Sequence, residues 1–157
     1  MTAGATSADE RVARVLARGI RRALADLGYG TLTELVLASG RRADVAGIDR
    51  RGDIVIVEIK SSLADLRADA KWPEYRDHCD ALYFAVPDGF PLHVLPDATG
   101  ILVADGFGAA LLRDAPRHPL PAARRRAVTL RFAMAASLRL GRLEDPSRTD
   151  LEAALLA

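Results

Sequence analysis

The segment 54–60, Ile-Val-Ile-Val-Glu-Ile-Lys, constrains the fold more than any other part of the chain. Its apolar run is typical of a strand that is buried in a sheet for most of its length. Because side chains alternate along a strand, Glu58 and Lys60 lie on the same face. A buried charge requires water, a charged partner or a metal ion, so we expect the end of this strand to meet one of these.

The flanking residues predict an α/β domain. Ser7 and Glu10 form a capping-box pattern, and apolar residues at three- and four-residue spacing then predict a helix over 8–27. Ser62 caps a helical stretch that Pro73 divides, which predicts two pieces over 63–71 and 73–79. Short β-rich runs predict strands over 34–39, 42–48, 54–60 and 81–86. The expected core order is therefore α-β-β-β-α-β.

The second half of the chain extends this core. Short apolar runs separated by Pro and Gly predict strands over 93–95, 100–104 and 109–113, and a helix follows over 121–141 with Val128, Phe132, Ala135 and Leu138 facing inward. Thr149 and Glu152 indicate a short terminal helix. We expect a central mixed β-sheet flanked by helices, in a single domain over 1–157 with flexible termini at 1–7 and 144–157.

Composition excludes several classes of protein. The 157 residues include 22 basic and 21 acidic side chains and one cysteine, Cys79, which rules out a disulfide framework and a cysteine-based zinc site and indicates a reducing, cytoplasmic setting. No apolar run approaches the roughly 20 residues of a membrane-spanning helix, and the first residues lack the pattern of a secretory signal. We therefore expect no membrane partner.

The spacing of the acids predicts a site. If residues 50–52 form a three-residue loop with Gly52 in the left-handed conformation, the register places Asp44 opposite Glu58, with Cβ atoms about 4.5–5.5 Å apart. Two carboxylates this close repel each other unless a proton or a cation lies between them, and Mg²⁺ prefers such oxygen ligands. Lys60 would orient an attacking water and neutralise charge on a phosphoryl oxygen. The alternative is a strand-end ion pair of Glu58 and Lys60, with Asp44 starting a turn.

These residues resemble a known family. Asp44, followed after thirteen residues by Glu58-Ile59-Lys60 between two helices, resembles the PD-(D/E)XK nuclease superfamily and its restriction-endonuclease-like fold. The segment 69–77, which contains Lys-Trp-Pro-Glu-Tyr, further resembles the bacterial MmcB-like DNA repair proteins, and the resemblance extends over about 8–142. Ala43 stands where the superfamily pattern has a proline that varies widely.

The resemblance implies roles for individual residues. Asp44 and Glu58 would bind Mg²⁺ or Mn²⁺ with the backbone carbonyl of Ile59, and Lys60 would be the catalytic lysine. Lys71 and Tyr75 match a Gln/Lys-x-x-x-Tyr element whose long side chain reaches back to the catalytic site, so Lys71 joins the catalytic candidates. Glu34 would correspond to an additional acid found in some members.

Arginine supplies the candidate DNA contacts. We expect a cluster on the C-terminal helix to hold a phosphate backbone near the carboxylate site without reading sequence: Arg124, Arg125, Arg126 and Arg131. The arginine face of the first helix is either a solvated stripe or a second phosphate-facing surface. We assign Trp72, His78 and Cys79 to packing, and residues 105–108 to a turn between strands.

The sequence thus predicts a metal-dependent DNA nuclease of DNA repair, a phosphodiester hydrolase whose partners are DNA and other repair proteins. One alternative is a non-catalytic DNA-binding or repair-complex module that retains the nuclease fold. A third interpretation is a structural ion pair in a protein that does not bind DNA.

Overall fold

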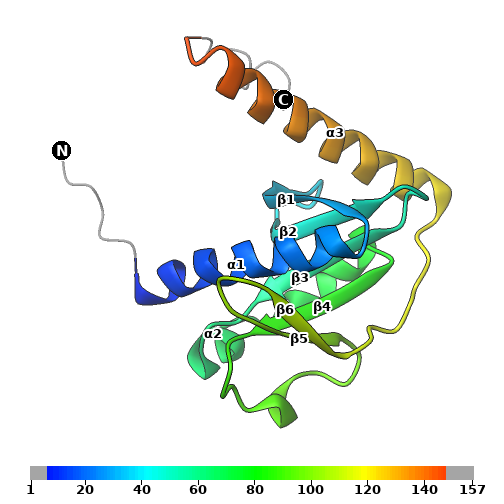
Figure 1. Cartoon of the computed structure of the whole chain (residues 1–157). Coiled ribbons are helices and arrows are strands. Elements are labelled where there is room, and N and C mark those ends of the chain that lie inside the picture. The colour runs from blue at the N-terminus through cyan, green and yellow to red at the C-terminus, as the bar shows by residue number, and fades with distance from the viewer. Residues whose placement is uncertain (1–6, 148–157) are drawn as a thin grey trace.

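A mixed six-stranded sheet forms the centre of the molecule, as the sequence predicted. The computed structural model describes residues 7–147, and the sheet order β1-β2-β3-β4-β5-β6 follows the order of the chain. The elements, seen in Figure 1, are α1 (Ala8–Asp26), β1 (Tyr29–Val36), β2 (Arg42–Asp49), β3 (Ile54–Ile59), α2 (Leu63–Ala68), the 3₁₀ helix η1 (Trp72–His78), β4 (Ala81–Val86), the 3₁₀ turn η2 (Leu92–Val94), β5 (Gly100–Ala104), β6 (Ala109–Arg113) and α3 (Ala122–Glu144).

The connections explain how the strands pair. Tight turns join β1 to β2, β2 to β3, and β5 to β6, and each of these pairs is antiparallel. The longer connections that contain α2 and η1, and then η2, make β3, β4 and β5 parallel to one another. The four central strands are therefore covered by chain on both faces, and every residue of β3 is buried.

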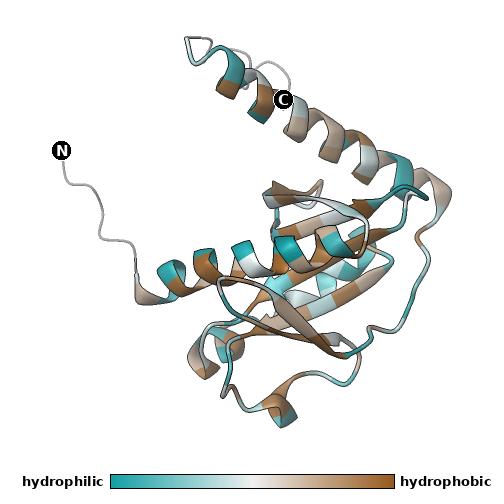
Figure 2. Ribbon diagram, viewed as in Figure 1, coloured by the Kyte–Doolittle hydropathy of each residue, from teal (hydrophilic) through white to brown (hydrophobic). Residues whose placement is uncertain are grey.

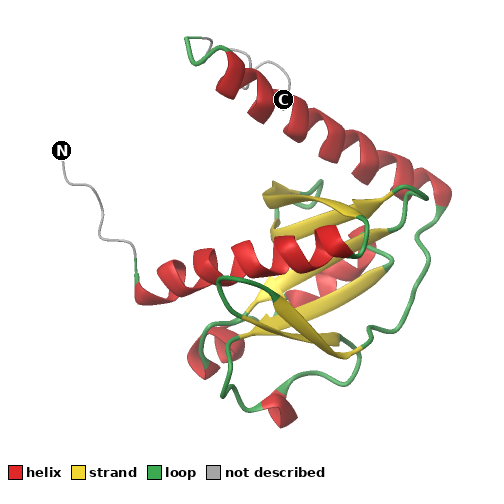
Figure 3. Ribbon diagram, in the orientation of Figure 1, coloured by secondary structure: helices red, strands yellow, loops and turns green. Residues whose placement is uncertain are grey.

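Helices cover the two faces of the sheet (Figure 3). On one face α1 buries Leu16, Ile20 and Leu24 against Val45 and Val57. On the other face η1 and α3 pack Tyr75 and Val128 against Leu35 and Ile56. Figure 2 shows α1 alternating between hydrophobic and hydrophilic residues, as expected for a helix with one face on a sheet.

Four element predictions were wrong in type or extent. The first strand covers Tyr29–Val36 rather than 34–39, because a turn at Gly40, with φ of +83°, ends the hairpin arm early. Residues 93–95 do not form a strand, since Pro91 and Pro96 flank them and Leu92–Val94 closes into a 3₁₀ turn. Residues 72–78 form a 3₁₀ helix, and α3 continues to Glu144.

Other sequence assignments are confirmed. Ser7 and Glu10 form the capping box of α1, and the Ser62 side chain caps α2. The Trp72 ring packs edge-on against Phe84, with ring centroids 5.6 Å apart. The suggested helix at 149–152 and the outer parts of both termini lie outside the described residues. Among the helices within 7–147, none is both long and apolar enough to cross a membrane.

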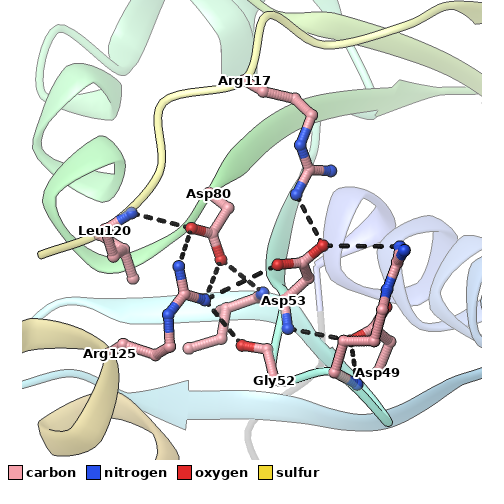
Figure 4. Close-up of polar contacts among 9 residues, drawn as sticks. Asp49, Gly52, Asp53, Asp80, Arg117, Leu120 and Arg125 are labelled. Atoms are coloured by element: carbon pink, nitrogen blue, oxygen red, sulfur yellow. Dashed lines mark hydrogen bonds and ion pairs between the residues drawn. The ribbon is translucent and has the colours of Figure 1, made fainter. Parts of the chain in front are cut away.

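A buried acid holds β3, β4 and α3 together at one end of the sheet (Figure 4). Asp80 is 1% exposed, and its carboxylate accepts hydrogen bonds from the amides of Ile54 and Leu120, each at 2.8 Å. The Arg125 guanidinium donates to both Asp80 oxygens, at 2.6 and 2.7 Å, and to the carbonyl oxygen of Gly52. Burial alone would raise the pKa of Asp80, but these donors hold it below its usual value.

Candidate functional site

The β2–β3 hairpin has the predicted register. The amide of Asp49 donates to the carbonyl of Asp53 at 3.1 Å, and Gly52 adopts a φ of +85° that favours glycine. Strand pairing continues to Val45 and Val57, which are directly opposed. The next positions along the two strands are Asp44 and Glu58, so the hairpin brings these two acids together.

Where the backbone pairing of β2 with β3 ends, the carboxylates of Asp44 and Glu58 accept hydrogen bonds from backbone amides. The Asp44 amide donates to Glu58 Oε1 at 3.1 Å, and the Ile59 amide donates to Asp44 Oδ2 at 2.7 Å. These reciprocal contacts fix the position of both side chains. They use one oxygen of each carboxylate and leave the other oxygen for a ligand.

The electrostatics of the pair favour a proton or a cation between the two groups. Burial raises the pKa of Asp44 to about 6, against the opposing effects of the Ile59 amide and the Lys60 ammonium. Glu58 is 3% exposed, and burial followed by the charge of Asp44 raises its pKa well above the usual range. The site therefore disfavours two free negative charges at neutral pH.

Lys60 has a partner that the sequence analysis did not assign. Its side chain is buried, and its Nζ lies 2.7 Å from Asp69 Oδ2 and 6.0 Å from the centre of the Phe84 ring. Asp69 follows the last residue of α2, so this short helix positions the counter-ion. Asp65, on α2 four residues before Asp69, accepts a hydrogen bond from the Ser61 amide and forms no ion pair with Lys60 within the described residues.

The donor set fits a hard divalent ion that keeps several water ligands. Within residues 7–147, no three Asp, Glu, His or Cys side chains converge in a way suited to a metal. Asp44 and Glu58 supply two carboxylates, and the carbonyl of Ile59 lies next to Glu58 in the chain. Mg²⁺ is commonly held by one or two carboxylates together with water and phosphate, which is the arrangement available here.

Glu34 lies opposite Asp44 on the neighbouring strand. The pairs Thr33 with Val45 and Leu35 with Ala43 enclose this position, where Glu34 has a φ of +54° that is unusual for a residue with a side chain. Its carboxylate forms an ion pair with Arg42 and is half exposed. Glu34 is thus near the acid pair without joining its hydrogen bonds.

The structure places Tyr75 and Lys71 differently from each other. The Tyr75 hydroxyl donates to the carbonyl oxygen of Arg42 at 3.0 Å; burial raises its pKa, and the charges of Glu58 and Asp44 raise it further. Tyr75 therefore contacts β2 two residues before Asp44, close enough for both acids to affect its pKa. Lys71 is exposed, and within the described part of the chain its ammonium makes no hydrogen bond or ion pair.

The structure places Arg125 away from the acid pair, contrary to the expectation. Arg125 is bound to Asp80 and Gly52 at the beginning of β3, whereas Glu58 lies near its end, about 13 Å along the strand from Ile54. Arg124 and Arg126 occupy the same turn of α3 and are exposed, and Arg131 is half-buried one to two turns further on. Arg124, Arg126 and Arg131 remain candidates for DNA binding.

Arginines of the first helix line a groove that reaches the site. A groove of about 1010 Å³ lies between α1 and β1, and Asp44 and Ile59 contribute to its lining. Four α1 arginines also line the groove, namely Arg14, Arg18, Arg21 and Arg22. The arginine face of α1 therefore lies along a groove that also reaches Asp44.

Comparison with known proteins places the chain in a family. A structure described as SPO1766 protein of unknown function, from Silicibacter pomeroyi, is similar with a TM-score of 0.86 and 40% identity, over 90% of this chain and 97% of that one. No curated protein matches the chain. The model of the family described as DNA repair protein MmcB-like matches residues 2–147. The chain therefore belongs to the MmcB-like family of DNA repair proteins.

Proposed function

We propose that the protein acts in DNA repair as a metal-dependent phosphodiesterase of the PD-(D/E)XK type, with Asp44, Glu58 and Lys60 as its catalytic residues. The observation that carries the proposal is the opposed pair of the buried Glu58 and the partly buried Asp44, with the buried Lys60 ammonium acting on the charge of both. A buried acid pair of this kind costs stability unless a cation uses it, and membership of a DNA repair family supports a phosphodiester as the substrate.

The residues divide the chemistry between them. Asp44, Glu58 and the carbonyl of Ile59 would hold Mg²⁺ or Mn²⁺, which when bound supplies Lewis-acid activation of water and of a phosphoryl oxygen. Asp69 accepts from one N–H of the Lys60 ammonium, so two remain to orient a water and to stabilise charge that develops on the phosphate. Because the backbone amides fix Asp44 and Glu58, both stay in position as the substrate enters.

A second function is a non-catalytic module that binds DNA or other repair proteins. Two observations favour it: Lys60 already has an ion-pair partner in Asp69, and no group of three metal-ligating side chains occurs within 7–147. Under this alternative the acid pair is retained with the nuclease fold but has no catalytic role. DNA binding then needs neither Glu58 nor a divalent ion.

Cleavage assays separate the two functions. Labelled single-stranded, duplex and branched DNAs are incubated with Mg²⁺, Mn²⁺ or EDTA and with wild type, Glu58→Gln or Asp114→Asn. The last variant removes one exposed carboxylate that no contact uses within the described residues. We expect metal-dependent cleavage by wild type and Asp114→Asn, and a loss of at least about 100-fold in Glu58→Gln.

Three results would contradict the nuclease proposal. Equal cleavage by wild type and Glu58→Gln would assign the activity elsewhere. Salt-sensitive DNA binding without cleavage by any of the proteins would support the non-catalytic module instead. Absence of both binding and cleavage for all three DNA shapes would remove both proposals.

A further inference from the structure

The groove between α1 and β1 carries positive charge that no side chain within residues 7–147 neutralises. Arg14 and Arg22 are exposed, and neither makes a hydrogen bond or ion pair within residues 7–147. Five arginines line the groove against three acids, Glu10, Glu34 and Asp44. Glu10 completes the capping box of α1, and Glu34 pairs with Arg42. A surplus of guanidinium groups in a groove is complementary to an anion with several charges.

The arginines follow the direction of the groove toward the acid pair. Arg14 and Arg22 are eight residues apart on α1, a rise of about 12 Å, which spans several successive phosphates of one strand. Arg21 donates from Nε to the Thr31 hydroxyl at 3.1 Å, which fixes its guanidinium against β1. Because Asp44 lines the same groove, an anion that follows the arginines reaches the candidate site.

An exposed aromatic ring lies beside this arginine row. Phe107 is 77% exposed at the β5–β6 turn, and the Arg18 guanidinium lies 5.9 Å from its ring centre. The turn is rigid, because Asp105 Oδ1 accepts from the amides of Phe107 and Gly108 at 2.7 and 2.9 Å. An exposed ring next to cationic side chains can stack an unpaired base, whereas the bases of a duplex are already stacked on each other.

We propose that the α1–β1 groove carries the backbone of a single DNA strand to the Asp44–Glu58 site, and that Phe107 stacks one of its bases. That the DNA strand ends at the Asp44–Glu58 site rests on the proposed function. Binding of DNA in the groove does not require cleavage. This surface differs from the α3 cluster that the sequence suggested, and it assigns a substrate class: DNA with an unpaired segment.

Binding measured in EDTA tests the groove without catalysis. Fluorescence anisotropy with a labelled thymidine oligonucleotide compares wild type with Arg14→Ala/Arg22→Ala and with Arg124→Ala/Arg126→Ala. The two double variants remove the same charge from exposed positions at different places on the molecule. We expect the groove variant to bind at least about tenfold more weakly, with a salt slope smaller by about 1.4, and the α3 variant to bind within about twofold of wild type.

Phe107→Ala tests the strand preference. We expect the affinity for the single strand to fall at least about fivefold, while the affinity for a hairpin duplex stays unchanged. Thermal unfolding of each variant confirms that it is folded. An unchanged groove variant, an equal loss in the α3 variant, or an equal effect of Phe107→Ala on both DNAs would overturn the proposal.

The two proposals fail in different ways. Groove-dependent binding by a wild type that never cleaves DNA would support the strand path and contradict the nuclease. Metal-dependent cleavage that persists at full rate and affinity in Arg14→Ala/Arg22→Ala would support the nuclease and contradict the strand path.

Discussion

Asp44 is a residue whose charge the folded chain disfavours at neutral pH. Burial raises its pKa from 3.8 to about 6, so folding is favoured by its protonated form. This contribution is complete below pH 3.8 and is lost as the pH rises through about 6. Asparagine cannot ionise, so Asp44→Asn should not lose this stability as the pH rises. In EDTA at pH 7.5 we expect the free energy of unfolding of the variant to exceed that of wild type by roughly 1–2 kcal/mol. Near pH 4 the two free energies should be similar.

Thermal unfolding from pH 4 to pH 8, with and without Mg²⁺, provides the measurement. Mg²⁺ should raise the melting temperature of wild type at pH 7.5 and have little effect on Asp44→Asn, because the variant lacks one of the two carboxylates. Asp114→Asn is the control for loss of one charge. Parallel curves of stability against pH for wild type and Asp44→Asn would show that the charge of Asp44 does not destabilise the folded protein.

Asp80 has the opposite dependence on pH. Its pKa lies below 3.8 in the folded chain, because the Arg125 guanidinium and two amides outweigh the effect of burial. The stabilisation is present above pH 3.8 and is lost as the pH falls below it. Asp80→Asn should therefore destabilise the protein by about 3–5 kcal/mol at pH 7, and urea titrations should show the difference from wild type shrinking toward pH 3. A constant difference across this range would contradict the ion pair.

At the scale of elements, α1 is packed closely against the β5–β6 turn at Gly19. A Cβ atom there would overlap the carbonyl oxygens of Asp105 and Gly108, which belong to backbone that cannot rotate away. We expect Gly19→Ala to destabilise the protein by about 2 kcal/mol or more, although alanine favours a helix by about 1 kcal/mol.

Gly141→Ala is the matched control in α3. Nothing lies within 4 Å of a Cβ atom at that position, so the intrinsic preference for alanine should stabilise the protein by about 0.5–1 kcal/mol. Both free energies of unfolding are measured by urea denaturation. Equal effects of the two substitutions would show that α1 does not contact the turn as closely as described.

The sequence predicted those elements that depend only on residues close together in the chain, such as capping residues and hairpin turns. Gly52 and the spacing of the hairpin gave the register that opposes Asp44 and Glu58, and capping residues gave the starts of α1 and α2. The partners of Lys60 and Arg125 could not be predicted, because Asp69 and Asp80 reach them only through tertiary packing. The groove arginines were ambiguous for the same reason: a solvated helix face and a groove wall have the same sequence pattern.

At the scale of the whole molecule, β3 connects two polar centres. Its first residue, Ile54, donates to Asp80, and the amide of its last residue, Ile59, donates to Asp44. The centres are about 15 Å apart along the strand and share no side chain, so their energetic effects should be independent. Both nevertheless depend on the same buried sheet, which favours unfolding in a single transition.

The double variant Asp44→Asn/Asp80→Asn tests both statements. We expect its free energy of unfolding to equal the sum of the two single effects within about 0.5 kcal/mol. Urea denaturation followed by circular dichroism and by Trp72 fluorescence should give coincident curves, since Trp72 packs against Phe84 of the central sheet. A coupling above about 1 kcal/mol would mean that β3 transmits strain between its ends, and separate transitions would mean that the sheet is not one cooperative unit.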